Sequence, residues 1–182
     1  MKKYEVEIKG ITPLLMNKPE DYGFDVQWVE KHATSDWEKE ALQKLYVDAE
    51  GTIYQPANHI EQTLMEAGKK VRVKGQGKAT YSKLFGSMIS VEPDAIPHIN
   101  QKYTINKSLV VIPSTKGRVM RYRPEFKDWG LKFFVFAEDE IAGPMIKEAL
   151  ELAGKYSGVG DWRPAKKGKF GKFQVVLFKE VN

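Results

Sequence analysis

Alternation of apolar and polar residues near the two ends of the chain predicts two β-strands. Tyr4, Val6 and Ile8 alternate with charged residues and are followed by Gly10, a pattern typical of a strand with one buried face. Near the C-terminus, residues 173–178 place apolar side chains on both alternating faces. We therefore expect one strand at each end of the fold.

Residues 129–137 carry the clearest strand pattern, because aromatic and β-branched residues follow one another almost without interruption. Near-continuous apolarity is typical of a central strand that is covered on both faces. Shorter patterns predict a small hairpin over 46–54, a strand over 87–91, an extended segment over 103–112 that leads into Pro113, and a weakly alternating strand over 118–124.

Two longer segments have the spacing of amphipathic helices. Residues 58–68 place Ile60, Leu64 and Ala67 on one face, with Asn58 and Glu61 spaced as in a capping box and Gly68 as the stop. Residues 144–154 begin with a proline in the first turn and end at a glycine. A short helix over 36–45 with Asp36 as N-cap and one helical turn over 82–86 complete the set, and residues 17–35 remain unassigned.

Without its insertions the chain has the order strand, helix, strand, strand, helix, strand. This order predicts an α+β, ferredoxin-like (RRM-like) domain, in which an antiparallel sheet carries two helices on one face. We expect residues 1–182 to form a single domain, with insertions near 17–54 and 93–125. The other face of such a sheet is open, and proteins of this shape often bind single strands there.

Composition excludes several classes of protein. The 182 residues contain no cysteine, which excludes disulfide frameworks, cysteine-ligated zinc, iron–sulfur clusters and thiol catalysis. Apolar runs stay well below the ~20 residues of a membrane span, and the first residues lack the apolar stretch of a signal peptide. We therefore expect a soluble, cytoplasmic protein without a membrane partner.

Charge is segregated along the chain, although the net charge is only +5. Residues 69–123 hold 12 basic and 2 acidic side chains, and residues 155–172 hold 6 and 1, whereas the remaining segments are acidic or neutral. Two basic tracts inside an otherwise acidic chain favour a polyanionic partner. The alternative is that they form a solvated charged surface.

The glycine-rich segment 154–173 combines glycine, basic and aromatic residues. Glycines allow backbone N–H groups to approach an anion, basic side chains bind phosphates, and aromatic rings stack on bases. Its candidate binding residues are Gly158, Gly160, Trp162, Arg163, Lys166, Lys167, Lys169 and Phe170. The segment lacks the strand–loop–helix context of a phosphate-binding P-loop and precedes a strand, which disfavours a dinucleotide fold.

Two further clusters are candidates for phosphate binding. The first follows the helix at 58–68 and comprises Lys69, Lys70, Arg72, Lys74 and Lys78. The second comprises Arg118, Arg121, Tyr122 and Arg123. Strand alternation would place Arg121 and Arg123 on one side, where two guanidinium groups can bind adjacent phosphates, with Tyr122 opposite.

The three histidines, His32, His59 and His98, lie far apart without the spacing of metal ligands. We therefore expect no metal site and no cofactor. His59 alone opens a helix where anions gather, and is a weak candidate for a general acid or base. No nucleophile elbow or carboxylate pair is present, so the sequence provides no support for nucleophilic or glycosidic catalysis.

Three stretches of the chain resemble the RAMP superfamily, the ferredoxin-fold RNA-binding subunits of CRISPR effector complexes. They are residues 8–14, residues 54–60 with Leu64 and Ala67, and, before and into the last strand, residues 158–163 with 169–175. The resemblance implies that residues 158–172, Asn58 with His59, and residues 69–78 contact the RNA backbone. It also fits a phage or mobile-element relative, and some members of the family are metal-independent endoribonucleases that use a histidine, a role only His59 could fill here.

Together these observations predict a non-catalytic protein that binds single-stranded nucleic acid, RNA rather than DNA, as a possible subunit of a CRISPR-type or phage ribonucleoprotein. Two alternatives remain open. One is a metal-independent endoribonuclease. The other is a structural protein that self-assembles as a homo-oligomer or with other subunits, because its basic and acidic segments are complementary.

Overall fold

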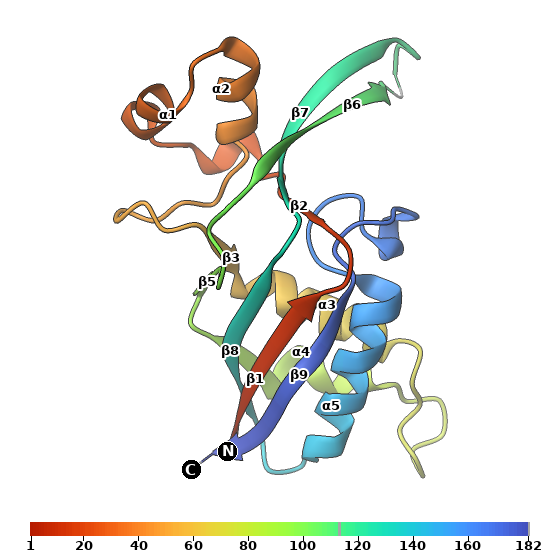
Figure 1. Cartoon of the computed structure of the whole chain (residues 1–182). Helices are drawn as coiled ribbons and strands as arrows, with labels where there is room; N and C mark the ends of the chain where they lie inside the picture. The colour runs from red at the N-terminus through yellow and green to blue at the C-terminus, as the bar shows by residue number, and fades with distance from the viewer. Residues whose placement is uncertain (113, 182) are drawn as a thin grey trace.

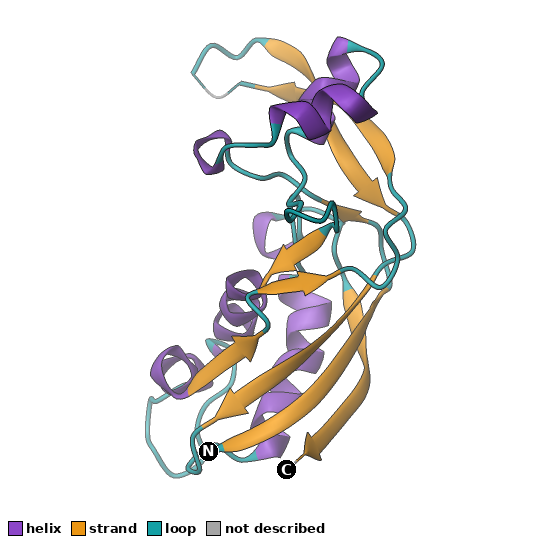
Figure 2. Cartoon of the chain, turned by 90° about the vertical axis from the view of Figure 1, so that its left-hand side faces the viewer, coloured by secondary structure: helices purple, strands orange, loops and turns teal. Residues whose placement is uncertain are grey.

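A computed structural model describes residues 1–112 and 114–181. Its core sheet has the strand order β4-β8-β1-β9, with every neighbouring pair antiparallel. The strands are β1 (Lys2–Gly10), β4 (Ile89–Glu92), β8 (Gly130–Ala137) and β9 (Phe173–Val181). Helices α3 (Ala57–Gly68) and α5 (Gly143–Leu152) cover one face of this sheet (Figures 1 and 2). The predicted α+β, ferredoxin-like fold is confirmed.

β8 is a central strand, as its near-continuous apolar sequence predicts, but helices cover only one of its faces. β8 pairs with β1 on one side and with β4 on the other. Val6 lies opposite Phe133 and Ile8 opposite Leu131, and all four side chains are buried against the helices. The alternating positions of β8 point to the other face of the sheet, where two phenylalanines are only half-buried.

The open face of the sheet carries half-buried aromatic rings next to a lysine, and charges of both signs. The ammonium of Lys3 lies 4.1 Å from the ring centre of Phe134 and 5.5 Å from that of Phe136. The Lys132 ammonium lies 2.7 Å from a Glu5 carboxylate oxygen. A face that carries acidic as well as basic side chains attracts a polyanion less than the basic loops do, so these loops are the better candidates.

Helix α3 forms where its apolar spacing predicts, but its ends differ from the prediction. Pro56 is the N-cap residue and no side chain caps the helix. Glu61 does not complete a capping box, because its carboxylate accepts a hydrogen bond from the Val91 N–H at 2.9 Å. Gly68 lies inside the helix, where a Cβ would come within 2.7 Å of the Ser82 backbone nitrogen. Its role is therefore the close approach of α3 to α4 (Tyr81–Met88).

The segment between β1 and α3 forms a small helical layer beside the core. It contains β2 (Leu14–Leu15), the 3₁₀ turn η1 (Glu20–Tyr22), α1 (Val26–His32), α2 (Asp36–Leu42) and β3 (Tyr54–Pro56). Asp25 caps α1 by accepting from the Trp28 N–H at 3.0 Å. Ser35, and not Asp36, is the N-cap residue of α2. The hairpin expected at 46–54 is present in a short form: Val47 forms an antiparallel bridge with Ile53, the Tyr54 N–H donates to the Tyr46 carbonyl, and the Asp48 N–H donates to the Thr52 carbonyl, both at 3.0 Å.

The segment between β4 and β8 forms a long two-stranded ribbon that extends away from the core (Figure 1). The ribbon consists of β6 (Thr104–Val111) and β7 (Arg118–Phe126), with β7 paired to β2 at its base. The segment also contains β5 (Ala95–Pro97), which pairs with β3. The predicted extended segment 103–112 corresponds to β6, while Pro113 lies outside the described residues. Helix α2 packs against β7 near the upper end of the molecule in the view of Figure 1.

The chain leaves α5 through an irregular segment before it enters β9. A π-helical turn, η2 (Ala153–Ser157), continues α5 past the predicted stop at Gly154. A 3₁₀ turn, η3 (Pro164–Lys166), lies in the middle of the glycine-rich segment. Within the described residues no helix is both long enough and apolar enough to span a bilayer.

Candidate nucleic-acid interface

The glycine-rich loop, defined here as residues 158–172, packs along helix α3. The Thr63 hydroxyl donates to the Gly158 carbonyl at 3.0 Å. The Arg163 guanidinium lies 3.1 Å from a Glu66 carboxylate oxygen and also donates to the Gly160 carbonyl at 3.3 Å. These contacts fix the loop at successive turns of the helix, which gives its exposed side chains a defined position.

The glycines of the loop shape it and do not present a free anion cradle. Gly158 and Gly160 have φ values of 69° and 81°, in the left-handed region that favours glycine. A Cβ on Gly160 would lie 2.5 Å from the Leu15 carbonyl oxygen. The Gly158 N–H donates to the Ala153 carbonyl at 2.8 Å and is not available to a ligand. Both glycines therefore serve close packing.

Two aromatic residues of the loop form one stacked unit. The rings of Trp162 and Phe170 lie 6.3 Å apart at an interplanar angle of 6°. Phe170 is buried, with 6% of its surface exposed, so it offers no face for a base. Trp162 is 43% exposed and retains an accessible surface. The structure therefore leaves Trp162 as the stacking candidate and makes Phe170 its support.

Three lysines of the loop are free surface cations. Lys166, Lys167 and Lys169 are all exposed. Among the described residues, no carboxylate lies within ion-pair distance of them. Arg163 differs from these lysines, because its guanidinium is held by Glu66. The lysines can bind phosphates without first breaking an internal contact.

The loop between α3 and α4 carries a second group of free cations. Its five predicted phosphate-binding residues, Lys69, Lys70, Arg72, Lys74 and Lys78, are all exposed. None has a carboxylate partner within the described part of the chain. The Lys70 ammonium lies 4.6 Å from the ring centre of Tyr156, at the end of η2. This contact places the start of the α3–α4 loop next to the segment that leads into the glycine-rich loop.

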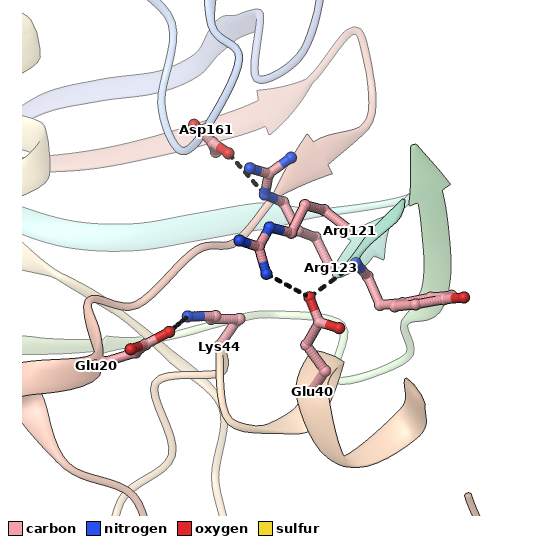
Figure 3. Close-up of polar contacts among 7 residues, drawn as sticks. Glu20, Glu40, Lys44, Arg121, Arg123 and Asp161 are labelled. Carbon is pink, nitrogen blue, oxygen red and sulfur yellow. Dashed lines mark hydrogen bonds and ion pairs between the residues drawn. The ribbon is translucent and has the colours of Figure 1, made fainter. Parts of the chain in front are cut away.

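The basic residues of β7 are mostly paired with acids (Figure 3). Arg121 and Arg123 occupy alternate positions of the strand, as predicted, but each has a carboxylate partner. Arg121 lies 3.6 Å from Glu40, and Arg123 lies 2.9 Å from Asp161. Of the three predicted arginines, Arg118 is exposed and has no ion-pair partner among the described residues.

Tyr122 is not an open stacking platform. Its ring lies 5.8 Å from that of Trp37 on α2, at an angle of 37°. The Lys107 ammonium lies 3.9 Å from the Trp37 ring and 5.9 Å from the Tyr122 ring. The Tyr122 N–H also faces a Glu40 carboxylate oxygen at 3.5 Å. Tyr122 therefore holds α2 against the ribbon.

Contacts between neighbouring segments connect the three basic clusters. Lys70 contacts the segment before the glycine-rich loop, and Arg163 binds that loop to α3. Asp161 of the same loop binds Arg123 on β7. In Figure 1 the α3–α4 loop, the glycine-rich loop and the β6–β7 ribbon follow one another from the lower to the upper part of the view. Three segments far apart in sequence thus form one candidate interface.

His59 lies in a cavity of about 320 Å³ between the start of α3, the glycine-rich loop and the chain after β2. Its Nδ1 is in contact with the Gln55 Nε2. Burial, together with the positive charge of Arg163, lowers the pKa of His59, so the ring is neutral at pH 7. Asp161 and Arg163 also line the cavity.

The other two histidines do not line this cavity. His98 is buried against Phe126 with ring centres 4.6 Å apart, and His32 is exposed on α1. Across residues 1–112 and 114–181, no three histidine, aspartate or glutamate side chains gather as ligands of a metal ion would.

Sequence reasoning missed the acids that pair with the arginines and the amides around His59. Glu40 and Asp161 come from segments far from β7, so no local pattern indicates them. Gln55 is 1% exposed although it is polar, and it stands in a short strand directly before a helix. A polar residue at a buried strand position is the only signal that could have identified it.

Comparisons with known proteins show similarity in fold without similarity in sequence. No protein-family model and no curated protein sequence matches the chain. A chain from the cryo-EM structure of the type III-B Cmr-beta complex bound to cognate target RNA matches with a TM-score of 0.67 and 12% identity. That match covers 100% of this chain and 61% of the other chain. A chain of a type IV-B CRISPR complex matches with a TM-score of 0.52 and 11% identity, covering 97% and 90%.

The expected likeness to subunits of CRISPR complexes is therefore confirmed at the level of the fold. This chain spans less than two thirds of the length of the Cmr-beta chain.

Proposed function

We propose that this protein binds single-stranded RNA as a non-catalytic subunit of a CRISPR-type ribonucleoprotein. The observation that carries the proposal is the set of eight unpaired cations on two adjoining loops: Lys69, Lys70, Arg72, Lys74, Lys78, Lys166, Lys167 and Lys169. The fold shared with chains of RNA-bound and CRISPR complexes supports the same proposal.

In this mechanism the backbone of the RNA follows the lysine-rich loops and a base stacks on Trp162. Exposed lysines that have no carboxylate partner gain most from phosphate, because no internal ion pair has to be broken. Trp162 adds a contact that any base can make, since every base has a π-face. Arg121 and Arg123 fix the ribbon and the glycine-rich loop, and they have a secondary role in phosphate binding.

The experiment is a binding titration of the purified protein with a 20-nucleotide RNA, the same sequence as DNA, and the RNA duplex. We expect binding to the single-stranded RNA at low salt, with weaker binding to the duplex, and nucleic acid that co-purifies with the protein. Absence of binding to single-stranded RNA at low salt would overturn the proposal.

The ribonuclease alternative rests on His59, whose neutral imidazole shares a cavity with Asp161 and Arg163. It predicts cleavage of RNA in the presence of a chelator and loss of cleavage in His59→Ala. Intact RNA after prolonged incubation with the wild-type protein would exclude this alternative.

A further inference from the structure

The cavity beside His59 has walls that carry hydrogen-bonding groups but no free charge. Only two lining residues are charged, and each has a partner: Asp161 binds Arg123 at 2.9 Å, and Arg163 binds Glu66 at 3.1 Å. The remaining polar walls come from amides, a hydroxyl and the neutral imidazole. Such a cavity does not suit a phosphate or a free cation, which would need an unpaired charge of opposite sign. It suits an uncharged polar ring.

An unsatisfied amide lines the same cavity. Gln55 is 1% exposed, and its Oε1 has no hydrogen-bond partner within the described residues. The strand pairing of Gln55 with Ile96 fixes its backbone, and its Nε2 is already in contact with the His59 Nδ1. A buried carbonyl oxygen without a donor carries a free-energy penalty that a ligand N–H group would remove.

His59 supplies the complementary donor. When the Gln55 amide donates to its Nδ1, the neutral ring carries its proton on Nε2. The cavity therefore offers an amide acceptor and an imidazole donor on neighbouring residues. A donor–acceptor pair of this kind matches the edge of a nucleobase, which alternates N–H groups with ring nitrogens or carbonyl oxygens.

The cavity beside His59 also has apolar walls, against which the flat face of a base can pack. Met16 and Tyr46 line the cavity and are buried, with 2% and 3% of their surfaces exposed. The Tyr46 ring stands edge-on to His59, 5.6 Å away at 80°. The volume of about 320 Å³ is at the lower end of ligand pockets, ~300–1,000 Å³, which suits a small ligand such as a single base.

We propose that this cavity receives a single unstacked base of the bound RNA, with Gln55 and His59 reading its edge. The inference rests on the proposed RNA-binding function and adds to it a site of base discrimination. The glycine-rich loop borders the cavity through Gly160, Asp161 and Arg163, and the same loop carries the exposed Lys166 and Lys167.

The test compares the affinities of the whole protein for oligo(A), oligo(C), oligo(G) and oligo(U) RNA at one salt concentration. We expect the wild-type protein to prefer at least one base over another by about tenfold, the lower bound for a good two-point base contact. In Gln55→Met, which keeps the length of the side chain and removes its hydrogen bonds, the four affinities should agree within about twofold.

Two further variants keep the test decisive. His59→Phe keeps an aromatic ring at the same cavity and removes the Nε2–H donor, so it should narrow the preference even if Gln55→Met unfolds. Gln174→Met, at an exposed position of β9, is the matched control and should keep the full preference.

The outcomes separate the two proposals. Equal binding of all four RNAs by the wild-type protein would overturn the base site while the proposed function stands. No binding of any RNA would overturn both. A preference that survives in both Gln55→Met and His59→Phe would assign discrimination to another surface and overturn the base site.

Discussion

Arg123 on β7 and Asp161 in the glycine-rich loop form an ion pair, with the guanidinium Nε 2.9 Å from the carboxylate oxygen (Figure 3). The two residues come from different basic segments of the sequence. Their side chains are only 18% and 31% exposed, so the pair is partly shielded from solvent. It connects the ribbon to the loop and makes the candidate interface continuous.

The first prediction concerns the strength of this pair. A double-mutant cycle with Arg123→Met and Asp161→Asn should give a coupling free energy of about 1 kcal/mol in urea unfolding, the upper part of the range for partly exposed pairs. The more exposed pair between Glu5 and Lys132 is the control, and its coupling should stay below about 0.5 kcal/mol. Equal couplings for the two pairs would contradict a specific role for Arg123 and Asp161.

The second prediction concerns base stacking. Trp162→Ala should weaken single-stranded RNA binding by about 1–3 kcal/mol, the value for loss of one stacked base. The thermal midpoint should change little, because the side chain is 43% exposed. Phe24→Ala removes an aromatic ring of nearly equal exposure, 42%, outside the interface and should leave affinity unchanged. An unchanged affinity in Trp162→Ala would remove Trp162 from the interface.

The third prediction concerns the packing of α3 against α4. Gly68→Ala should destabilise the protein by about 1–3 kcal/mol, because its Cβ would come within 2.7 Å of the Ser82 backbone nitrogen. Gly86→Ala, at an exposed position of α4, meets only the Met65 sulfur at 3.7 Å and should be neutral or stabilising by up to about 1 kcal/mol. Equal effects of the two substitutions on urea unfolding would show that the close contact is absent.

The fourth prediction concerns pH. Burial lowers the pKa of His98 to about 4 from the ordinary value near 6.5. The unfolded chain therefore binds a proton between pH 6.5 and pH 4 while the folded protein does not, so the stability supplied by a neutral His98 is lost as pH falls through this window. The loss amounts to about 3 kcal/mol at the lower end.

His98→Leu tests the pH prediction by comparison with the wild-type protein. The difference in stability between the two should shift in favour of the variant as pH falls from 6.5 to 4. His32→Gln, at an exposed histidine, should track the wild-type curve. Parallel curves for the wild type and His98→Leu would contradict the account of His98.

The central strand and the two helices of the core could be predicted because each is specified by local spacing. β8 is apolar on both faces, and α3 repeats its apolar residues with a helical period. The start of α3 could not be predicted in detail, because the Glu61 carboxylate accepts a hydrogen bond from the Val91 N–H, 30 residues away, and does not cap the helix. The unassigned segment 17–35 contains α1, whose short length and single buried residue give a weak pattern.

The candidate site, like the fold, could be predicted from the sequence only in part. The free lysines of two loops were visible as runs of charge without acids, and they are exposed as that pattern predicts. The sequence could not show that Arg121 and Arg123 are paired with acids or that the Phe170 ring is buried, because these neighbours come together only through tertiary contacts. Gln55 became a candidate only when its unpaired oxygen and the cavity were seen together.

The most direct test of the central claim is the salt dependence of single-stranded RNA affinity. For the wild-type protein, log affinity should fall linearly with log salt, by about 0.7 per phosphate bound. Lys166→Ala with Lys167→Ala should reduce this slope by about 1.4, whereas Lys147→Ala with Lys179→Ala, on exposed positions of α5 and β9, should leave it unchanged. An identical slope in both double variants, or no binding at low salt, would contradict an RNA interface on these loops.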